Sequence, residues 1–147
     1  MAYISSSLEL VSASAIHQDR PGLPLYLAPV EAGFPSPAED YLDRRLDLHQ
    51  HLVRNEAATF FLRAHGESML GAGIHDGDLL IVDRSVDAVH RKVVIAALDG
   101  ELTVKRLLHR EGRVFLAPEN PQFEPIDITE SECVYIWGVV TYVVHKL

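Results

Sequence analysis

A serine and a lysine in this chain stand in contexts that suit nucleophilic catalysis. Ser68 lies in the run GESML, and Lys105 lies in the run ELTVKRL. A serine hydroxyl is a weak nucleophile until a neighbouring group takes its proton, and an uncharged lysine amine can do this in place of histidine. Upstream, the bond between Ala32 and Gly33 joins two small residues that can enter a narrow cleft. Together these features predict a protease and its own substrate.

Lys105 can act as a base only after it has lost its proton. With a reference pKa near 10.4, about one lysine in 2,500 is neutral at pH 7, whereas a pKa near 7 leaves about half of them neutral. Burial lowers the pKa of a lysine because a low-dielectric environment disfavours the charged form. We therefore expect Lys105 to be partly desolvated among apolar residues.

The second half of the chain has the pattern of a β-sheet. Asp99-Gly100 between two apolar runs is typical of a two-residue hairpin turn, which places Lys105 on the second of two antiparallel strands. Alternation along that strand puts Thr103 and Leu107 on the same face as Lys105. Segments rich in β-branched and aromatic residues predict strands at 58–64, 78–84, 92–98, 101–108, 112–118 and 134–144.

The segment between the first two of these strands carries glycines at 66, 71, 73 and 77. Glycine adopts backbone conformations that other residues avoid, so such punctuation is typical of turns. It predicts that Ser68 lies in a turn or at the head of a short helix.

The N-terminal part of the chain has a different composition. Residues 1–32 are rich in Ser and Ala, contain several prolines, and show no sustained helical or strand period. We interpret them as an extended arm, too short for an independent DNA-binding domain. This predicts an N-terminal arm at 1–32 and a mainly β catalytic domain at 33–147.

Two interpretations remain open for the segment that follows the arm. Ser36, Pro37 and Glu39 fit a capping box with proline at the first helical position, which predicts a helix. Alternatively, the leucines at 42, 46 and 48 predict a strand, after which Asp47 would cap a short helix reaching residue 54.

Length and charge limit the function classes. The 147 residues suffice for one domain plus a tail, and the net charge of −8 without a basic cluster disfavours specific DNA binding. The single cysteine, Cys133, rules out an intrachain disulfide. We see neither a membrane-spanning run nor a signal peptide, so we expect a cytoplasmic protein without a membrane anchor.

The runs 59-TFFLRAHGESMLGAGIHDGDLLIVDRS-85 and 93-VVIAALDGELTVKRL-107 resemble the Ser-Lys self-cleaving domain that LexA-type repressors share with UmuD-type mutagenesis proteins. The resemblance is closest to UmuD, the accessory subunit of an error-prone translesion polymerase, and includes 32-AGFPSPAEDY-41. It implies the LexA/signal-peptidase-like β fold and peptidase S24 activity, with Ser68 as nucleophile and Lys105 as general base. Backbone amides near Glu67 and Ser68 are implied as oxyanion donors, and Ala32-Gly33 as the scissile bond.

The resemblance also implies a biological role and partners. We expect an SOS-response protein whose self-cleavage is stimulated by a RecA filament on single-stranded DNA. Its processed form would be a homodimer that joins a UmuC-type polymerase, and 23-LPLYL-27 is a candidate sliding-clamp contact. UmuD proteins often carry Cys-Gly at the cleaved bond, whereas Ala-Gly is the version found in repressors.

Three alternative functions fit the sequence less well. A repressor-type regulator would need a DNA-binding head, and the arm is too short to supply one. A binding module without proteolysis would not need Ser68 and Lys105. A type I signal peptidase shares the Ser-Lys logic but would need a membrane anchor.

The remaining reactive residues have simpler interpretations. The eight histidines, among them His49, His51, His65, His75, His90 and His109, show no motif spacing for a metal, so we expect neither a metal site nor a cofactor. Asp76, Asp78 and Asp83 are interpreted as turn residues. Cys133 is expected in the core, and Trp137 in the core or at a dimer surface.

Overall fold

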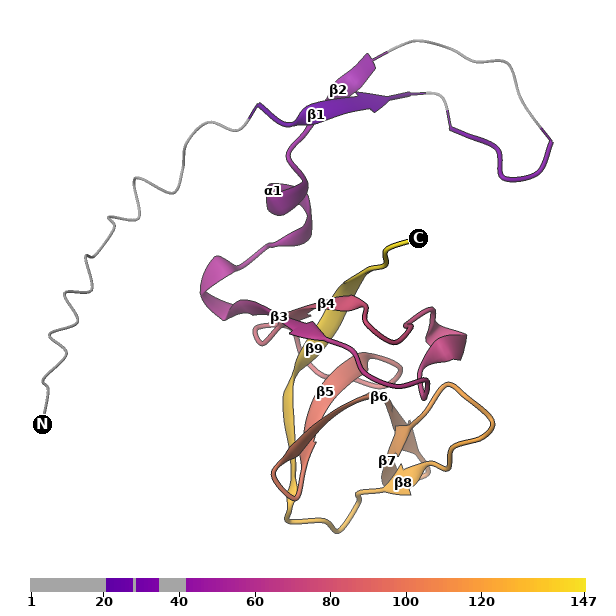
Figure 1. Cartoon of the computed structure of the whole chain (residues 1–147). Coiled ribbons are helices and arrows are strands. Elements are labelled where there is room, and N and C mark those ends of the chain that lie inside the picture. Colours follow the sequence, from indigo (N-terminus) through magenta and orange to yellow (C-terminus); the bar gives the residue numbers. More distant parts are fainter. Residues whose placement is uncertain (1–20, 28, 35–41) are drawn as a thin grey trace, which may run out of the picture. The chain divides into compact units, whose positions relative to one another are not determined.

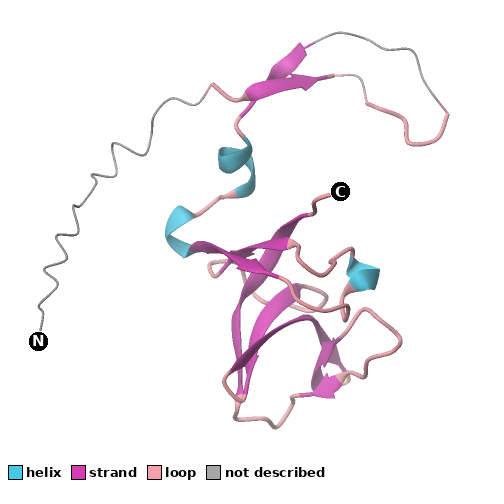
Figure 2. Cartoon of the chain, viewed as in Figure 1, coloured by secondary structure: helices cyan, strands magenta, loops and turns pink. Residues whose placement is uncertain are grey.

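The computed structural model describes residues 21–27, 29–34 and 42–147. The chain divides into two compact units, Met1–His51 and Leu52–Leu147, which we describe separately. Strands dominate the second unit, as Figure 2 shows, so the prediction of a mainly β domain is confirmed.

The larger unit is built on a seven-stranded antiparallel sheet with the order β3-β4-β9-β5-β6-β7-β8 (Figure 1). The C-terminal strand β9 lies between β4 and β5 and pairs with both. The bounds are β3 Thr59–Arg63, β4 Leu79–Asp83, β5 Val93–Leu98, β6 Glu101–Arg110, β7 Arg113–Ala117, β8 Ile126–Asp127 and β9 Val134–Val144. Six of these strands lie where the sequence predicted them. The two-residue β8 was not predicted.

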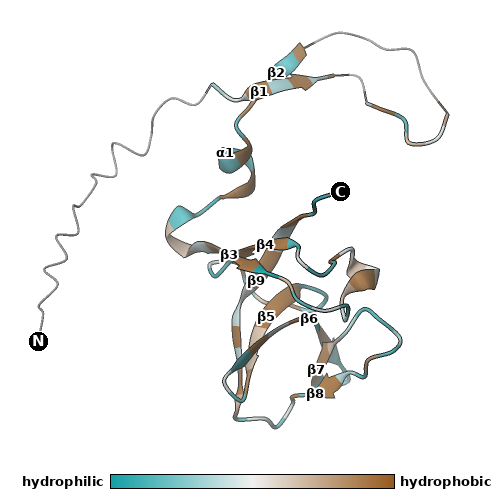
Figure 3. Cartoon of the chain, in the orientation of Figure 1, coloured by the Kyte–Doolittle hydropathy of each residue, from teal (hydrophilic) through white to brown (hydrophobic). Residues whose placement is uncertain are grey.

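The core of this unit consists of two apolar clusters contributed by alternate positions of the central strands. One cluster includes Met69, Leu80 and Ile95, and the other includes Val94 and Leu116. Figure 3 shows the apolar colour concentrated on the central strands. Met69 is only 2% exposed and follows Ser68 directly, so it anchors the serine turn to the first cluster.

The hairpin that carries Lys105 forms as predicted. Leu98 pairs with Glu101, and Asp99 and Gly100 between them have φ values of 49° and 84°. Positive φ at both central positions is typical of a type I′ turn, whose twist matches that of the flanking strands. Lys105 therefore lies on a long, regular strand, opposite Val94.

Strand β9 bends through two irregularities in its pairing. The β4–β9 register shifts between Ile81 and Val82 of β4. The β5–β9 register shifts between Ile95 and Ala96 of β5. Gly138 lies where β9 approaches β4 closely, since a Cβ atom there would stand 2.7 Å from Cγ1 of Val82. Trp137, next to it, stacks edge-on against Phe60 with ring centroids 5.1 Å apart. Trp137 is thus a half-buried residue packed against the core.

The smaller unit contains β1 (Leu23–Tyr26), β2 (Leu42–Leu46) and the short helix α1 (Leu48–Leu52), whose last residue belongs to the larger unit. Asp47 Oδ1 accepts hydrogen bonds from the backbone N–H groups of His49 and Gln50, at 3.0 and 3.3 Å. This is the N-cap of the second interpretation, a strand followed by a capped helix, which is confirmed except that the helix ends at Leu52 and not at residue 54. The alternative helix start at Ser36, Pro37 and Glu39 lies outside the described residues.

Two expectations differ from the structure. Residues 23–26 of the arm form β1, which pairs antiparallel with β2, although the arm sequence shows no strand period. Pairing supplied by a distant segment makes this strand, so local pattern alone could not reveal it. Cys133 is exposed, not a core residue, because it lies in the turn immediately before β9.

Candidate active site

Ser68 lies in a turn between β3 and β4, as the glycine pattern predicted, and the short 3-10 helix η3 (Leu70–Ala72) follows it. Gly66, with φ of 92°, donates its N–H to Asp76 Oδ1 at 2.7 Å. On the other side, the N–H of Glu119 donates to the carbonyl of Ser68 at 2.8 Å. The turn is therefore held from both ends by hydrogen bonds.

The segment at Glu119 and Asn120 braces this turn further. Asn120 Nδ2 donates to the carbonyl of Glu67 at 2.8 Å, and Gly71 N–H donates to the carbonyl of Glu119 at 2.7 Å. A Cβ atom at Gly71 would stand 2.7 Å from that same carbonyl oxygen, so only glycine permits the close approach. The Glu119 side chain is itself held by Arg106 of β6. Nothing in the local sequence indicated these bracing residues.

Lys105 reaches Ser68 from β6. Its Nζ lies 3.1 Å from Ser68 Oγ, 2.9 Å from Thr103 Oγ1 and 3.1 Å from the carbonyl oxygen of Val104. Thr103 stands two positions before Lys105 on one face of the strand, as the alternation predicted. The structure thus joins in one hydrogen-bonded group the serine and lysine that the sequence selected.

The surroundings of Lys105 lower the pKa of its amine below the ordinary value of 10.5, because partial burial disfavours the ammonium form. The side chain is half-buried. Its three contacts are a hydroxyl, a second hydroxyl and a carbonyl, and no carboxylate is among them. A lysine in this setting can supply the neutral amine that a proton acceptor needs.

A cleft of about 260 Å³ opens beside Ser68. One wall comes from β3 and the residues just after it, including Leu62 and Ala64. Leu102, Thr103 and Val104 of β6 also line the cleft. The lining is mixed, with apolar side chains and polar groups in about equal measure, so the cleft fits an extended peptide backbone that carries small or apolar side chains.

The backbone amides of Glu67 and Ser68 are the predicted oxyanion donors. The carbonyl groups of Glu67 and Ser68 accept hydrogen bonds from Asn120 and Glu119. Within the described part of the chain, the N–H groups of Glu67 and Ser68 have no hydrogen-bond partner. These two amides are therefore available to a ligand, and their role as oxyanion donors stays a prediction.

Ala32 and Gly33 belong to the smaller unit and are exposed. They lie in the connection between β1 and β2. The neighbouring Val30, which could have anchored the arm, is 96% exposed. An exposed loop without regular pairing is the kind of segment that a protease can bind in extended form, but whether this bond is cleaved stays a prediction.

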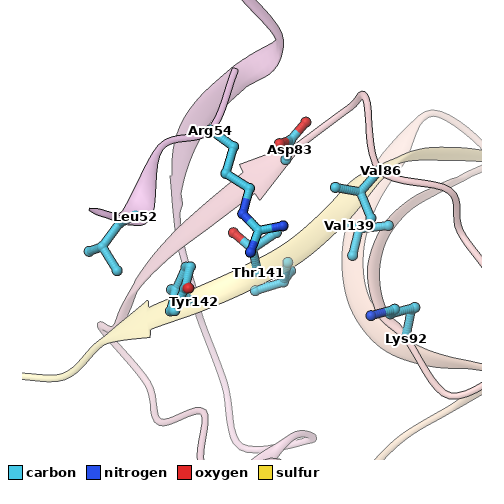
Figure 4. Close-up of a pocket in the computed structure, with 9 residues that line it drawn as sticks. Leu52, Arg54, Asp83, Val86, Lys92, Val139, Thr141 and Tyr142 are labelled. Atoms are coloured by element: carbon cyan, nitrogen blue, oxygen red, sulfur yellow. The ribbon is translucent and has the colours of Figure 1, made fainter. Parts of the chain in front are cut away.

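A second pocket, of about 280 Å³, lies along β9 (Figure 4). Arg54 and Lys92 supply its positive charge, Tyr142 supplies a phenolic hydroxyl, and Thr141 supplies an aliphatic hydroxyl. That hydroxyl donates to the backbone carbonyl of Ile81 at 3.2 Å, and Lys92 is not among its hydrogen-bond partners in the described residues. Among the described residues Thr141 is thus not paired with a base, and the cleft at Ser68, where a hydroxyl and an amine meet, is the better candidate for chemistry.

The histidines and aspartates are arranged in a way that spacing did not indicate. His75 and Asp78 lie together with His145, which is 67 positions after Asp78 in the chain and so forms no local motif with it. Asp83, expected in a turn, is instead the buried last residue of β4, and its Oδ1 accepts from the N–H of Ser85 in the turn that follows, at 2.8 Å. No helix among the described residues is long and apolar enough to cross a membrane.

Comparison with known proteins agrees with this architecture. Residues 24–141 match the family model described as Peptidase S24-like. Protein MucA of Salmonella typhimurium is 47% identical over 135 residues, covering 91% of this chain and 89% of that protein. Protein ImpA of the same species is 50% identical over 125 residues, covering 84% of this chain and 83% of that protein. The LexA repressor of Vibrio vulnificus is 35% identical over 143 residues, covering 97% of this chain and 68% of the repressor.

Proposed function

Because the chain belongs to the peptidase S24-like family, we propose that it is a serine endopeptidase that cleaves itself between Ala32 and Gly33. The observation that carries this proposal is the 3.1 Å contact between Lys105 Nζ and Ser68 Oγ. A half-buried amine with a lowered pKa at that distance is placed to take the hydroxyl proton.

The proposed reaction has two steps. Ser68 Oγ attacks the carbonyl carbon of Ala32 while Lys105 takes its proton, and the N–H groups of Glu67 and Ser68 stabilise the oxyanion. The C–N bond then breaks, the Lys105 ammonium returns the proton to the nitrogen of Gly33, and an ester remains on Ser68. Water hydrolyses this ester, again with Lys105 as base, and frees the carboxylate of Ala32.

The substrate would bind as an added strand. Among the described strands, β3 is the first in the sheet order and pairs with β4 alone, so its outer edge carries backbone groups that an extended peptide can pair with. The cleft beside Ser68 runs along the end of this strand. Tethering of the substrate raises its effective concentration, so weak binding suffices for a single turnover.

The biological role that we propose is SOS mutagenesis. It is supported by the UmuD-type resemblance of the sequence and by 46–50% identity to MucA, ImpA and SamA over most of the chain. The fragment 33–147, as a homodimer, would join a UmuC-type translesion polymerase in the cytoplasm. A RecA filament would stimulate cleavage by raising the population in which the arm occupies the cleft.

The alternative is a repressor-type regulator, favoured by the 35% identity to a LexA repressor. Such a regulator reads DNA with a recognition helix in the major groove. The described part of the chain has one α-helix, α1. Its five residues are too few to form a recognition helix. The higher identity to MucA and ImpA further favours the mutagenesis role.

Intact-mass spectrometry tests the proteolytic claim. Wild type, Ser68→Ala and Lys105→Ala are incubated with and without RecA filaments, and we expect a new N-terminus at Gly33 in the wild type alone. Lys92→Ala is the matched control, because it removes a lysine from the other pocket, and it should cleave like wild type. A product in Ser68→Ala, or a cut elsewhere in the chain, would overturn the mechanism.

A further inference from the structure

A cluster of two imidazoles and one carboxylate lies at the junction of β4, β9 and the loop that carries Ser68. His75, Asp78 and His145 each offer one ligand atom, and these atoms lie within 4.8 Å of one another. Asp78 is 3% exposed, whereas the side chains of His75 and His145 are 50% and 41% exposed. The cluster therefore has a buried carboxylate at its base and an open side toward solvent.

The fold preorganises this cluster. Leu79 of β4 pairs with Val144 of β9, and these two strands lie side by side in Figure 1. In an antiparallel ladder the next pair outward is Asp78 and His145. His75 is tied to the same place, because its N–H donates to Asp78 Oδ2 at 2.8 Å and its carbonyl accepts from Asp78 N–H at 3.1 Å.

The two imidazoles lie near different oxygens of the Asp78 carboxylate. His145 Nδ1 lies 2.5 Å from Oδ1 of Asp78, while His75 Nδ1 lies 3.6 Å from Oδ2. The second distance is too long for a hydrogen bond. It is close to the spacing of about 3.3 Å between two ligand atoms of one tetrahedral ion with metal–ligand bonds of about 2.0–2.1 Å.

The charge of the group also suits a cation. The pKa of the Asp78 carboxyl is held below its ordinary value chiefly by the hydrogen bond from the His75 N–H, against an opposing contribution from burial and with help from His145. The carboxylate is thus ionised at neutral pH. The two imidazole rings lie beside this anion with their centroids 4.5 Å apart and their planes tilted by 33°.

We propose that His75, Asp78 and His145 form a binding site for a divalent transition-metal ion of the zinc class. Two imidazole nitrogens and one carboxylate oxygen would bind the ion from one side and leave a position for water. His145 must move back from Asp78 for the ion to enter. It can do so because it follows the last residue of β9, outside the strand itself.

An ion at this site would fasten the end of β9 to the loop between β3 and β4. That loop includes Ser68, and its two ends are already joined by hydrogen bonds between Ala64 and Asp78 and between Gly77 and Ala64. Binding to the folded state alone raises its stability. The proposal is independent of proteolysis, since a chain without any peptidase activity would bind the ion equally well.

The test is a titration of the untagged full chain carrying Ser68→Ala, which keeps it intact whether or not wild type cleaves itself. Zinc chloride is the probe in isothermal titration calorimetry and thermal unfolding, and cobalt(II) is the probe for visible absorption. We expect one ion per chain, a rise in melting temperature, and the absorption bands of tetrahedral or five-coordinate cobalt.

Single variants identify the ligands. His75→Ala and His145→Ala should each weaken zinc binding by more than about tenfold, the lower limit for loss of even an outer partner of a metal ligand. His65→Ala is the matched control, because it removes an imidazole that lies 3.0 Å from Asp76 on the same loop but outside the cluster. Equal weakening in all three variants, or no saturable binding in the parent chain, would overturn the proposal.

Discussion

The amine of Lys105 and the hydroxyl of Ser68 meet at 3.1 Å across two elements that form by unrelated means. Lys105 lies on a hairpin strand whose turn is encoded by Asp99-Gly100. Ser68 lies in a glycine-bounded turn that depends on Glu119 and Asn120 for its shape. The contact therefore depends on the sheet as a whole.

The first prediction concerns the pH dependence of self-cleavage. The proposed base is neutral Lys105, and burial places its pKa below 10.5. As pH rises through that lowered pKa the neutral fraction grows, so the cleavage rate should increase and then level off below pH 10.5. Intact-mass time courses from pH 6 to pH 10 measure this profile. A rate that stays constant or falls over this range would contradict a lysine base.

The second prediction concerns Thr103, whose Oγ1 lies 2.9 Å from Lys105 Nζ. Thr103→Val removes an acceptor for the ammonium and leaves the shape nearly unchanged, so the midpoint of the pH profile should move down. The maximal rate should fall roughly fivefold to tenfold, because one hydrogen bond of about 1 kcal/mol no longer positions the amine. Thr103→Ser keeps the hydroxyl and should retain the wild-type midpoint. Equal profiles for both variants would show that the hydroxyl has no part in positioning Lys105.

The third prediction concerns the close approach at Gly138. Gly138→Ala would place its Cβ 2.7 Å from Cγ1 of Val82, a residue that is fully buried. Overpacking of this kind costs about 1–3 kcal/mol of unfolding free energy, measurable by urea denaturation. The double variant Gly138→Ala with Val82→Ala removes the clash. It should therefore lose less stability than the sum of the single losses; simple additivity would argue against the clash.

The fourth prediction concerns stability in acid. Hydrogen bonds from Thr129, with help from Arg113, lower the pKa of Asp127 from 3.8 to about 2. As pH falls, Asp127 takes up a proton in the unfolded state at a higher pH than it does in the folded state. The stabilisation is therefore complete above pH 3.8 and is lost as pH falls toward 2. Thermal unfolding of Asp127→Asn should differ from wild type above pH 4 and converge on it near pH 2. Glu124→Gln, at an exposed carboxylate, should follow wild type throughout.

The fifth prediction concerns the arm after cleavage. Among the described residues, a cut at Ala32-Gly33 leaves β1 attached to β2 through the pairing of Leu23–Tyr26 with Leu42–Leu46 and through exposed hydrogen bonds from Arg45 to the carbonyls of Pro21 and Gly22. A two-stranded ribbon is marginally stable in water, so fragment 1–32 should dissociate from fragment 33–147. Size-exclusion chromatography followed by mass spectrometry of the cleaved protein measures this. Co-elution of the two fragments would show that the pairing outlasts the cut.

Local sequence determined much of this protein. Alternation of apolar residues and the Asp99-Gly100 turn specified six strands and the face on which Lys105 lies beside Thr103. Glycines on either side of Ser68 specified its turn. Asp47 specified the start of α1. Each of these features follows from residues that are near neighbours in the chain, where steric preference and short-range hydrogen bonds decide the conformation.

Tertiary structure alone decided the rest. β1 exists because β2 pairs with it, and Gly71 is required because Glu119 passes within contact distance. Asp78 and His145 meet because the β4–β9 register places them opposite each other. Such contacts join residues far apart in the chain, and their energy depends on the register and close packing of the whole sheet. No local pattern encodes that geometry, so it could be found only in the folded molecule.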